Sequence, residues 1–225
     1  AVNDVPIMTT QAITINEDIP TDITLSATDV DGDNLTYRIL TVDNGSTSIS
    51  GSTVTYTPPA NLNGANADII FWVANDGTSD GINSESGASE SKVFISINAV
   101  NDAPTTTDIS TTIDENRTAR MVGITLQGSD VDGDNLTYSV VSDASNGSTS
   151  ISGATLTYTA NQDWNGTETI TYKANDGTVD SNTSTITVTV TAVNDAPVTT
   201  DASASTNEDT NVLTDLTSNI TDIDN

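Results

Sequence analysis

The sequence predicts an all-β protein built from tandem Greek-key β-sandwiches, and three observations support this fold class. The phrase Ala-Val-Asn-Asp-Xaa-Pro starts at residues 1, 99 and 192, a period of roughly 95 residues. Short stretches alternate between apolar residues and Thr or Ser, which is the two-residue period of a strand. Asp-Gly, Asn-Gly and Ser-Gly pairs, which are typical of turns, separate these stretches. The period is too long for a solenoid unit and fits a small domain repeated in tandem.

Seven strands are expected in the first repeat. Each places Ile, Val, Leu or Tyr on alternate positions, which form the core face, and Thr or Ser on the solvent face. In chain order they are residues 12–15, 23–26, 35–39, 46–50, 54–56, 68–73 and 93–100. In the second repeat the clearest strands are residues 170–172 and 186–190. Seven short strands in one such domain indicate a seven-stranded Greek-key sandwich of immunoglobulin-like shape, and no stretch shows the period of a helix.

Two further features bear on the cores and loops. Trp72 and Trp164 are expected to fill the two sandwiches, because large aromatic rings contribute much of the buried area of a core. The repeats differ most after the phrase Ala-Asn-Asp-Gly, where the first repeat is longer. We expect its additional residues, around 81–91, to form a flexible loop before the last strand.

The repeat boundaries divide the chain into residues 1–98, residues 99–191 and an incomplete third repeat, residues 192–225. Each full repeat is long enough to bury a core of its own. The third stretch has room for two strands at most, and two strands are marginal without partners. Because both ends cut through the repeat pattern, we expect the sequence to be part of a longer array.

The charge is strongly negative, with 32 acidic residues, five basic residues, no histidine and a formal net charge of −27. Such a chain repels nucleic acids and anionic membrane surfaces, so neither nucleic-acid binding nor direct membrane insertion is expected. The chain has no cysteine and therefore no disulfide to staple a small exported domain. With its abundant Thr, Ser, Asn and Asp, it fits a bacterial or archaeal surface protein stapled by metal ions instead.

The phrase Asp-Val-Asp-Gly-Asp-Asn occurs at residues 29–34 and 130–135. It looks like the start of an EF-hand loop, but the flanking helices and the bidentate Glu at position twelve are missing. Carboxylates on alternate residues of a tight turn can still converge on one Ca²⁺, which takes six to eight oxygen ligands. Two carboxylates about 4 Å apart repel by roughly 4 kcal/mol at an effective dielectric constant of 20, so a cation is expected between them. The alternative is an acidic turn without an ion, since Asp and Gly favour turns.

Three more features recur with the repeat. They are an early Glu, an Asp late in the domain, and the Asn-Asp pair of the linker before Pro. Together with the Asp-Xaa-Asp turn, this layout resembles tandem cadherin-like repeats, in the bacterial form common in giant surface adhesins and secreted RTX-type proteins. In cadherins these features bind a small Ca²⁺ cluster at each junction. The resemblance covers essentially the whole chain and implies Ca²⁺ as the cofactor.

Carried over by residue, the resemblance implies one complete junction, formed by Glu17, Asn101, Asp102, Asp130, Asp132, Asn135 and Asp176. A second junction would use Glu115, Asn194, Asp195, Asp222 and Asp224. At the front of the chain, a preceding domain would complete a site made by Asn3, Asp4, Asp29, Asp31, Asn34 and Asp76. The linker is poorer in acidic residues than that of animal cadherins, and the mid-domain Asp-Arg-Glu motif is missing, with only Asp163 as a stand-in. Fewer ions per junction are therefore expected than in animal cadherins.

The resemblance implies a calcium-rigidified spacer of an extracellular adhesin or surface filament, as in biofilms. Neighbouring repeats of the same chain are then its partners, with identical chains or surface polysaccharide as further ones. One alternative is a polysaccharide- or cell-binding sandwich, which would need an exposed aromatic platform. Another is a subunit of an extracellular polymer, in which residues 192–225 pair with another chain by strand complementation. An enzyme is not expected, because histidine and cysteine are absent and the carboxylate clusters recur with the repeat, not once in a cleft.

Overall fold

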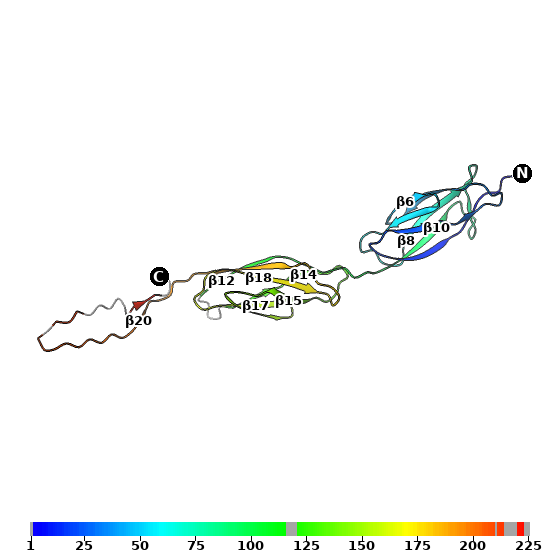
Figure 1. Ribbon diagram of the computed structural model, residues 1–225. Coiled ribbons are helices and arrows are strands. Elements are labelled where there is room, and N and C mark those ends of the chain that lie inside the picture. Colours follow the sequence, from blue (N-terminus) through cyan, green and yellow to red (C-terminus); the bar gives the residue numbers. More distant parts are fainter. Residues whose placement is uncertain (1, 116–120, 210, 214–219, 223–225) are drawn as a thin grey trace. The chain divides into compact units, whose positions relative to one another are not determined.

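The computed structural model describes residues 2–115, 121–209, 211–213 and 220–222, and the secondary structure of these residues consists of strands (Figure 1). The prediction of an all-β fold is confirmed. Within the described part of the chain, no helix has the length and apolar character needed to cross a bilayer. The chain divides into two compact units, residues 1–102 (unit 1) and residues 103–225 (unit 2). The repeat boundaries expected from the sequence remain a prediction.

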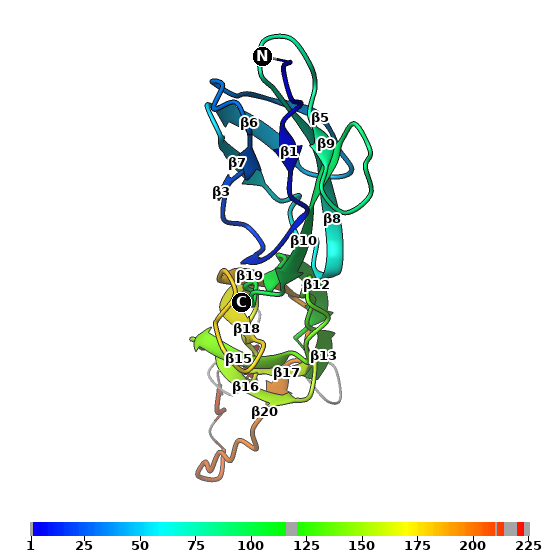
Figure 2. The ribbon, with the colours of Figure 1, turned by 90° about the vertical axis from the view of Figure 1, so that its right-hand side faces the viewer.

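Unit 1 is a sandwich of two main sheets, and Figure 2 shows β3, β6 and β7 on one side with β8 and β10 on the other. The larger sheet has the strand order β2 (Gln11–Asn16), β10 (Ser91–Asn98), β8 (Gly64–Asn75) and β5 (Thr36–Val42). The smaller sheet has the order β3 (Thr21–Thr24), β7 (Thr53–Thr57) and β6 (Ser46–Ser50). These seven strands overlap the seven ranges expected from the alternating pattern.

A third small sheet was not predicted. It has the order β4 (Ala27–Thr28), β1 (Ile7–Met8) and β9 (Ile82–Asn83). Strand β9 lies in the stretch predicted as a flexible loop, and the side chain of Asn83 there is only 4% exposed. Its amide nitrogen donates to the hydroxyls of Thr10 and Ser91, both at 2.9 Å. A strand of two residues shows no period, so this ordering could not be found in the pattern.

Unit 2 repeats the two main sheets. One has the order β12 (Ile109–Asp114), β19 (Ser184–Thr191), β18 (Gly166–Asn175) and β15 (Thr137–Ser142). The other has the order β13 (Met121–Thr125), β17 (Thr155–Ala160) and β16 (Gly147–Ser152). Two pairs of short strands complete its described residues: β11 (Thr105–Thr106) with β14 (Gly128–Ser129), and β20 (Val198–Thr199) with β21 (Ile220–Thr221).

In both units the first long strand pairs in parallel with the last. Strand β2 runs beside β10 and ends with Asn16 opposite Asn98, and β12 runs beside β19 and ends with Asp114 opposite Thr191. Parallel neighbours begin at the same end of a sheet and finish together at the other end. The chain therefore comes into each sandwich at one end and leaves it at the opposite end.

The apolar face of each strand forms the core, as expected. Trp72 on β8 is fully buried in unit 1, which confirms its predicted role. At the corresponding position of β18, Tyr172 is fully buried and takes the central place in the core of unit 2. Trp164 is half-buried and packs against that core from a loop. The expectation that both tryptophans fill a core therefore applies fully to Trp72 alone.

Each unit also buries a carboxylate that organises a turn. Asp68 on β8 is 1% exposed and accepts hydrogen bonds from the Tyr56 hydroxyl at 2.6 Å and from the backbone amide of Gly45 at 2.6 Å. Burial raises the pKa of Asp68, but the hydrogen bonds from Tyr56 and from backbone amides outweigh it and lower the pKa. In unit 2, Glu168 accepts from the backbone amide of Asn146 at 2.6 Å. The hydroxyl of Tyr158 donates at 3.1 Å to the neutral carbonyl of Asn146.

Replacing Tyr56 by Phe is expected to destabilise unit 1 by about 1.5–3 kcal/mol, because a buried carboxylate loses a hydrogen-bond donor. Tyr158→Phe is the matched control in unit 2 and is expected to cost about 0.5–1.5 kcal/mol, because its acceptor is uncharged. Urea unfolding monitored by fluorescence and circular dichroism measures both losses. Equal losses in the two variants would contradict the charged role of Asp68.

The same contact predicts a pH dependence. The folded pKa of Asp68 is lowered, so its contribution to stability is present above its unfolded pKa of about 4 and is lost as the pH falls through the folded pKa. Tyr56→Phe removes a bond that lowers this pKa. The loss of unfolding free energy of unit 1 below about pH 4 is therefore expected to be smaller in the variant than in the wild type. An unchanged loss would contradict the assignment.

Replacing Gly147 by Ala is expected to destabilise unit 2 by about 1–3 kcal/mol through overpacking. A Cβ on Gly147 would come within 3.0 Å of the Tyr158 Cζ atom and still closer to the Thr159 carbonyl oxygen. Gly123→Ala in the same sheet is the control, because the nearest atom to its Cβ would be the Thr155 Cγ2 at 3.6 Å. Thermal unfolding should show a lower melting temperature for the first variant only; a similar fall in both would argue against close packing at Gly147.

Candidate metal centres

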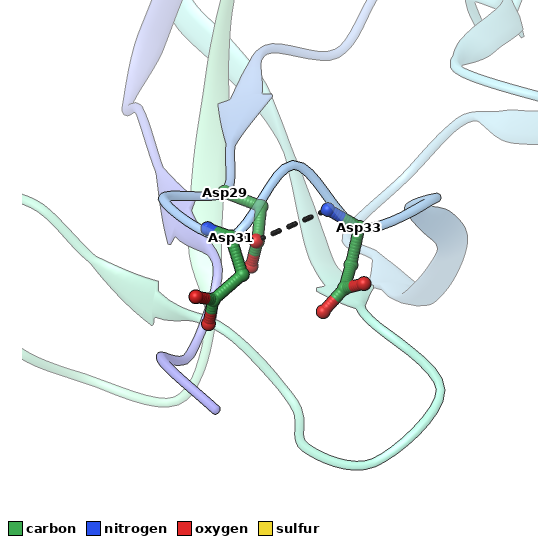
Figure 3. A group of neighbouring side chains, drawn as sticks. All are labelled: Asp29, Asp31 and Asp33. Carbon is green, nitrogen blue, oxygen red and sulfur yellow. Dashed lines mark hydrogen bonds between the residues drawn. The ribbon is translucent and has the colours of Figure 1, made fainter. Parts of the chain in front are cut away.

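A tight turn after β4 carries three carboxylates of unit 1. The Asp29 Oδ1 atom accepts hydrogen bonds from the backbone amides of Asp31 at 2.9 Å and Asp33 at 3.3 Å. Between them Gly32 has a φ of 78°, a left-handed conformation that favours glycine. The ligand oxygens of the three aspartates lie within 4.8 Å of one another. Figure 3 shows the three side chains on the same side of the turn.

The same turn recurs in unit 2. The Asp130 Oδ1 atom accepts from the amides of Asp132 at 2.9 Å and Asp134 at 3.3 Å, and the three aspartates again lie within 4.8 Å of one another. The sequence prediction named the first two aspartates of each turn and missed Asp33 and Asp134. The signal was present, because the third aspartate continues the alternate spacing of the first two. The predicted amide ligands Asn34 and Asn135 follow directly in the sequence and are exposed.

The first residues of the chain reach this turn in unit 1. The backbone amide of Asp4 donates to Asp31 Oδ2 at 2.8 Å, and the side-chain amide of Asn3 donates to Asp76 Oδ2 at 2.8 Å. Asp76 lies in the loop after β8, so the structure brings three separate segments together. The hydrogen bond from Asn3, followed by those from the amides of Ser79 and Thr78, holds the pKa of Asp76 well below its usual range. Hydrogen bonds thus connect Asn3 with Asp76 and Asp4 with the acidic turn, and the role of these residues as metal ligands remains a prediction.

The residues of the predicted complete junction are divided between the units. Glu17, Asn101 and Asp102 belong to unit 1, whereas Asp130, Asp132, Asn135 and Asp176 belong to unit 2. Within unit 2, the Asp176 Oδ1 atom accepts from the amides of Thr178 at 2.6 Å and Val179 at 2.7 Å, as Asp76 does with its own loop. The predicted ligands of unit 2 thus lie in hydrogen-bonded turns, and their convergence with those of unit 1 remains a prediction.

The two early glutamates lie away from the carboxylate turns. Glu17 is 1% exposed and Glu115 is 2% exposed. The Glu17 Oε1 atom accepts from the backbone amide of Val100 at 2.7 Å, and its Oε2 atom accepts from the Asn63 side chain at 3.5 Å. Both glutamates were predicted as metal ligands; the structure places each at the end of its sandwich where the chain leaves.

The second predicted junction falls partly within the described residues. A cavity of about 500 Å³ in unit 2 is lined by Asp163, Asp195 and Asp222 together with neutral neighbours. Asp195 and Asp222 were predicted ligands, and Asp163 was the stand-in for the missing mid-domain motif. Asn194 donates to the carbonyl of Asp195 at 2.8 Å, as Asn101 does to that of Asp102 at 3.0 Å. Asp224 lies outside the described residues.

These groups fit a hard divalent cation. The Asp29 Oδ2 and Asp130 Oδ2 atoms are buried, and no hydrogen-bond donor among the described residues reaches them. A buried carboxylate oxygen without a donor is costly, and a cation can take the donor's place. The surrounding groups offer carboxylate and amide oxygens, which suit Ca²⁺, and the chain has no histidine or cysteine to favour a softer metal.

Solved structures share this fold. Human protocadherin-24 EC1-2 (form II) has a TM-score of 0.59 and 16% identity, with 84% of this chain and 100% of that chain covered. Human CDH23 EC21-23 has a TM-score of 0.58 and 16% identity, with 98% of this chain and 80% of that chain covered. At these identities the likeness shows the fold alone. A comparison with curated protein sequences finds no match.

A family model described as bacterial Ig domain matches residues 3–85 and 101–189, which is more than half of the chain. With the cadherin-like fold, this match confirms the resemblance to bacterial cadherin-like tandem repeats. Domains of this kind are structural modules and not enzymes. The chain therefore belongs to the bacterial Ig domain family and carries two copies of the domain in tandem.

Proposed function

We propose that this chain is a calcium-rigidified spacer of an extracellular adhesin or surface filament, with Ca²⁺ held at the junctions between repeats. The observation that carries the proposal is the three-carboxylate turn, which recurs in both units with the same hydrogen bonds. In each turn the carboxylates are close enough to repel strongly, and one buried oxygen has no hydrogen-bond donor among the described residues. A shared cation turns this repulsion into attraction.

The residues that would hold the ion lie at the end of each sandwich where the chain comes in. In unit 1 they are Asp29, Asp31 and Asp33 from the turn, with Asp4 and Asp76 alongside. Ca²⁺ accepts six to eight oxygens in flexible geometry, whereas Mg²⁺ demands a near-ideal octahedron and keeps several waters. A turn with three carboxylates plus oxygens from other segments suits the larger ion.

The topology explains why such sites would stiffen an array. Because β2 and β10 are parallel, the outgoing linker leaves from the end opposite the carboxylate turn. In the proposal, the linker brings Asn101 and Asp102 to the incoming end of the next repeat, where Asp130, Asp132 and Asp176 lie on unit 2. In this proposal the repeats are residues 1–98, residues 99–191 and the start of a third repeat at residues 192–225. Ca²⁺ shared between them fixes their orientation.

The proposed setting is extracellular. Calcium sites of extracellular modules typically have a Kd of about 10⁻⁴–10⁻³ M, which matches calcium outside cells. The absence of cysteine fits a metal staple in place of a disulfide. Neighbouring repeats of the same chain are the partners in this proposal.

The polysaccharide alternative has less support from the structure. Sugar-binding surfaces rely on exposed aromatic rings, but Trp72, Tyr56, Tyr158 and Tyr172 are each 0% exposed. These are the largest aromatic side chains of the two cores. The other five aromatic side chains are half-buried, so no fully exposed ring is present in the described residues to form a sugar platform; they are Tyr37, Phe71, Phe94, Tyr138 and Trp164.

Replacing Asp130 and Asp132 by Asn is expected to abolish calcium-dependent stiffening while both sandwiches stay folded. The double variant removes two carboxylates from the turn of unit 2. The amide oxygen of Asn at position 130 can still accept the backbone hydrogen bonds that hold the turn. Small-angle scattering with EDTA and with calcium measures the stiffening. Glu85→Gln with Glu90→Gln is the matched control, because it removes the same charge from a loop outside both turns. If the Asp variant and the wild type respond alike to calcium, the proposed ligands are wrong.

Calcium at about 2 mM is expected to stabilise each domain that binds one ion by about 0.6–1.8 kcal/mol for a Kd of 10⁻³–10⁻⁴ M. For domains of this size the gain corresponds to a rise of several degrees in melting temperature, measured by calorimetry. Magnesium at the same concentration is the control and should raise the melting temperature less. A melting temperature that does not respond to calcium would leave a metal-independent pair of sandwiches.

A further inference from the structure

We propose that Glu17 and Glu115 are positioning residues that fasten the outgoing linker to its own sandwich without a metal ion. The proposal does not rest on the calcium sites. It rests on where the two buried carboxylates direct their hydrogen bonds and on the register of the parallel strands beside them.

The carboxylate of Glu17 stands in for a missing backbone acceptor. In a parallel ladder, a residue that donates its amide to one residue of the partner strand accepts from the amide two residues further on. The Glu17 amide donates to the Asn98 carbonyl at 3.1 Å, so its own carbonyl should accept from Val100. The Val100 amide instead donates to the Glu17 side chain, at Oε1, at 2.7 Å.

The backbone of unit 1 shows why this exchange occurs. Asp18 has a φ of 63°, so the chain turns away from β10 directly after Glu17, and Pro20 follows two residues later. The backbone ladder therefore stops at Asn98, but the carboxylate extends it to Val100. The other oxygen is held by Asn63, from the loop before β8, at 3.5 Å. A polar side chain that is only 1% exposed is thus satisfied by hydrogen bonds from the linker and from its own domain.

Unit 2 repeats the arrangement at the same register. The Glu115 amide donates to the Thr191 carbonyl at 3.1 Å, and the Val193 amide donates to Glu115 Oε1 at 2.7 Å. Asn165 donates to Glu115 Oε2 at 3.1 Å. The same hydrogen bonds occur in two domains whose surrounding residues differ, which indicates that they belong to the repeat itself.

A side-chain hydrogen bond also joins the last residue pair of each parallel ladder, between different side chains in the two units. The Asn98 side chain donates to Asn16 Oδ1 at 3.1 Å, and the Thr191 hydroxyl donates to Asp114 Oδ1 at 2.6 Å. In both units these side-chain hydrogen bonds lie two residues before the valine whose amide the glutamate accepts. The start of the linker is therefore fixed to its sandwich, and any freedom of the linker begins after Val100 or Val193.

Amide hydrogen exchange of the whole chain in EDTA, monitored by NMR, tests the proposal. The Val100 amide is expected to be protected in the wild type, and Glu17→Ala should speed its exchange by about ten- to a hundredfold, the equivalent of a hydrogen bond to a charged group. Glu17→Gln keeps an acceptor oxygen and should restore part of the protection. The amides of Val93 and Ile95 in the same strand report whether the sandwich stays folded.

Matched controls separate the local effect from a general loss of charge or stability. Asp18→Asn removes the neighbouring exposed carboxylate, and Asn can adopt the left-handed backbone conformation at this position. The exchange rate of the Val100 amide should therefore be unchanged. Glu115→Ala should expose the amide of Val193 and leave that of Val100 protected. Should Glu17→Ala unfold unit 1, Asn63→Ala is the milder variant, because it removes only the support of Oε2.

Three outcomes would overturn the proposal. One is rapid exchange of Val100 in the calcium-free wild type. Another is protection of Val100 that survives Glu17→Ala in a folded protein. The third is protection that arises only when calcium is added, which would make Glu17 a metal ligand and not a metal-independent fastening. Because the measurement is made in EDTA, a failure of the calcium proposal would leave this result unaffected.

Discussion

The parallel pairing of the first and last long strands is the constraint on which the rest of each unit depends. An antiparallel pair would return the chain to the end where it came in, whereas β2 with β10 and β12 with β19 carry it from one end to the other. This gives each sandwich two different ends. The carboxylate turn lies with the incoming segment in unit 1, and the buried glutamate lies beside the outgoing one.

The two ends of each sandwich differ in how their carboxylates are satisfied. At the outgoing end a single carboxylate is buried, and amides of the linker and of Asn63 or Asn165 satisfy it. At the incoming end, three carboxylates share one small volume and leave a buried oxygen of Asp29 or Asp130 without a hydrogen-bond donor among the described residues. The first arrangement is complete within the domain. The second is a strong repulsion that a cation would relieve, which is the basis of the proposed calcium sites.

The two units perform the same structural tasks with different side chains. Trp72 is replaced by Tyr172 in the core, and the buried Asp68 is replaced by Glu168. In unit 1, Arg38 on β5 forms an ion pair with Asp80 in the loop after β8. In unit 2, Asp180 in the loop after β18 pairs instead with Lys173 on β18. The turn glycines are kept at corresponding positions, because a left-handed backbone conformation tolerates fewer substitutes than core volume does.

The sequence by itself determined the repeat period, the all-β class, the seven main strands of the first repeat and the acidic turns. Each of these depends on local chemistry: two-residue alternation, glycine in a left-handed turn, and aspartates at alternate positions. Only the tertiary structure decided that β1, β4 and β9 form a small sheet and that Glu17 and Glu115 accept the hydrogen bonds of the linker. Those outcomes depend on contacts between segments far apart in the sequence, and a buried carboxylate looks the same in a sequence whether its partner is a metal ion or a backbone amide.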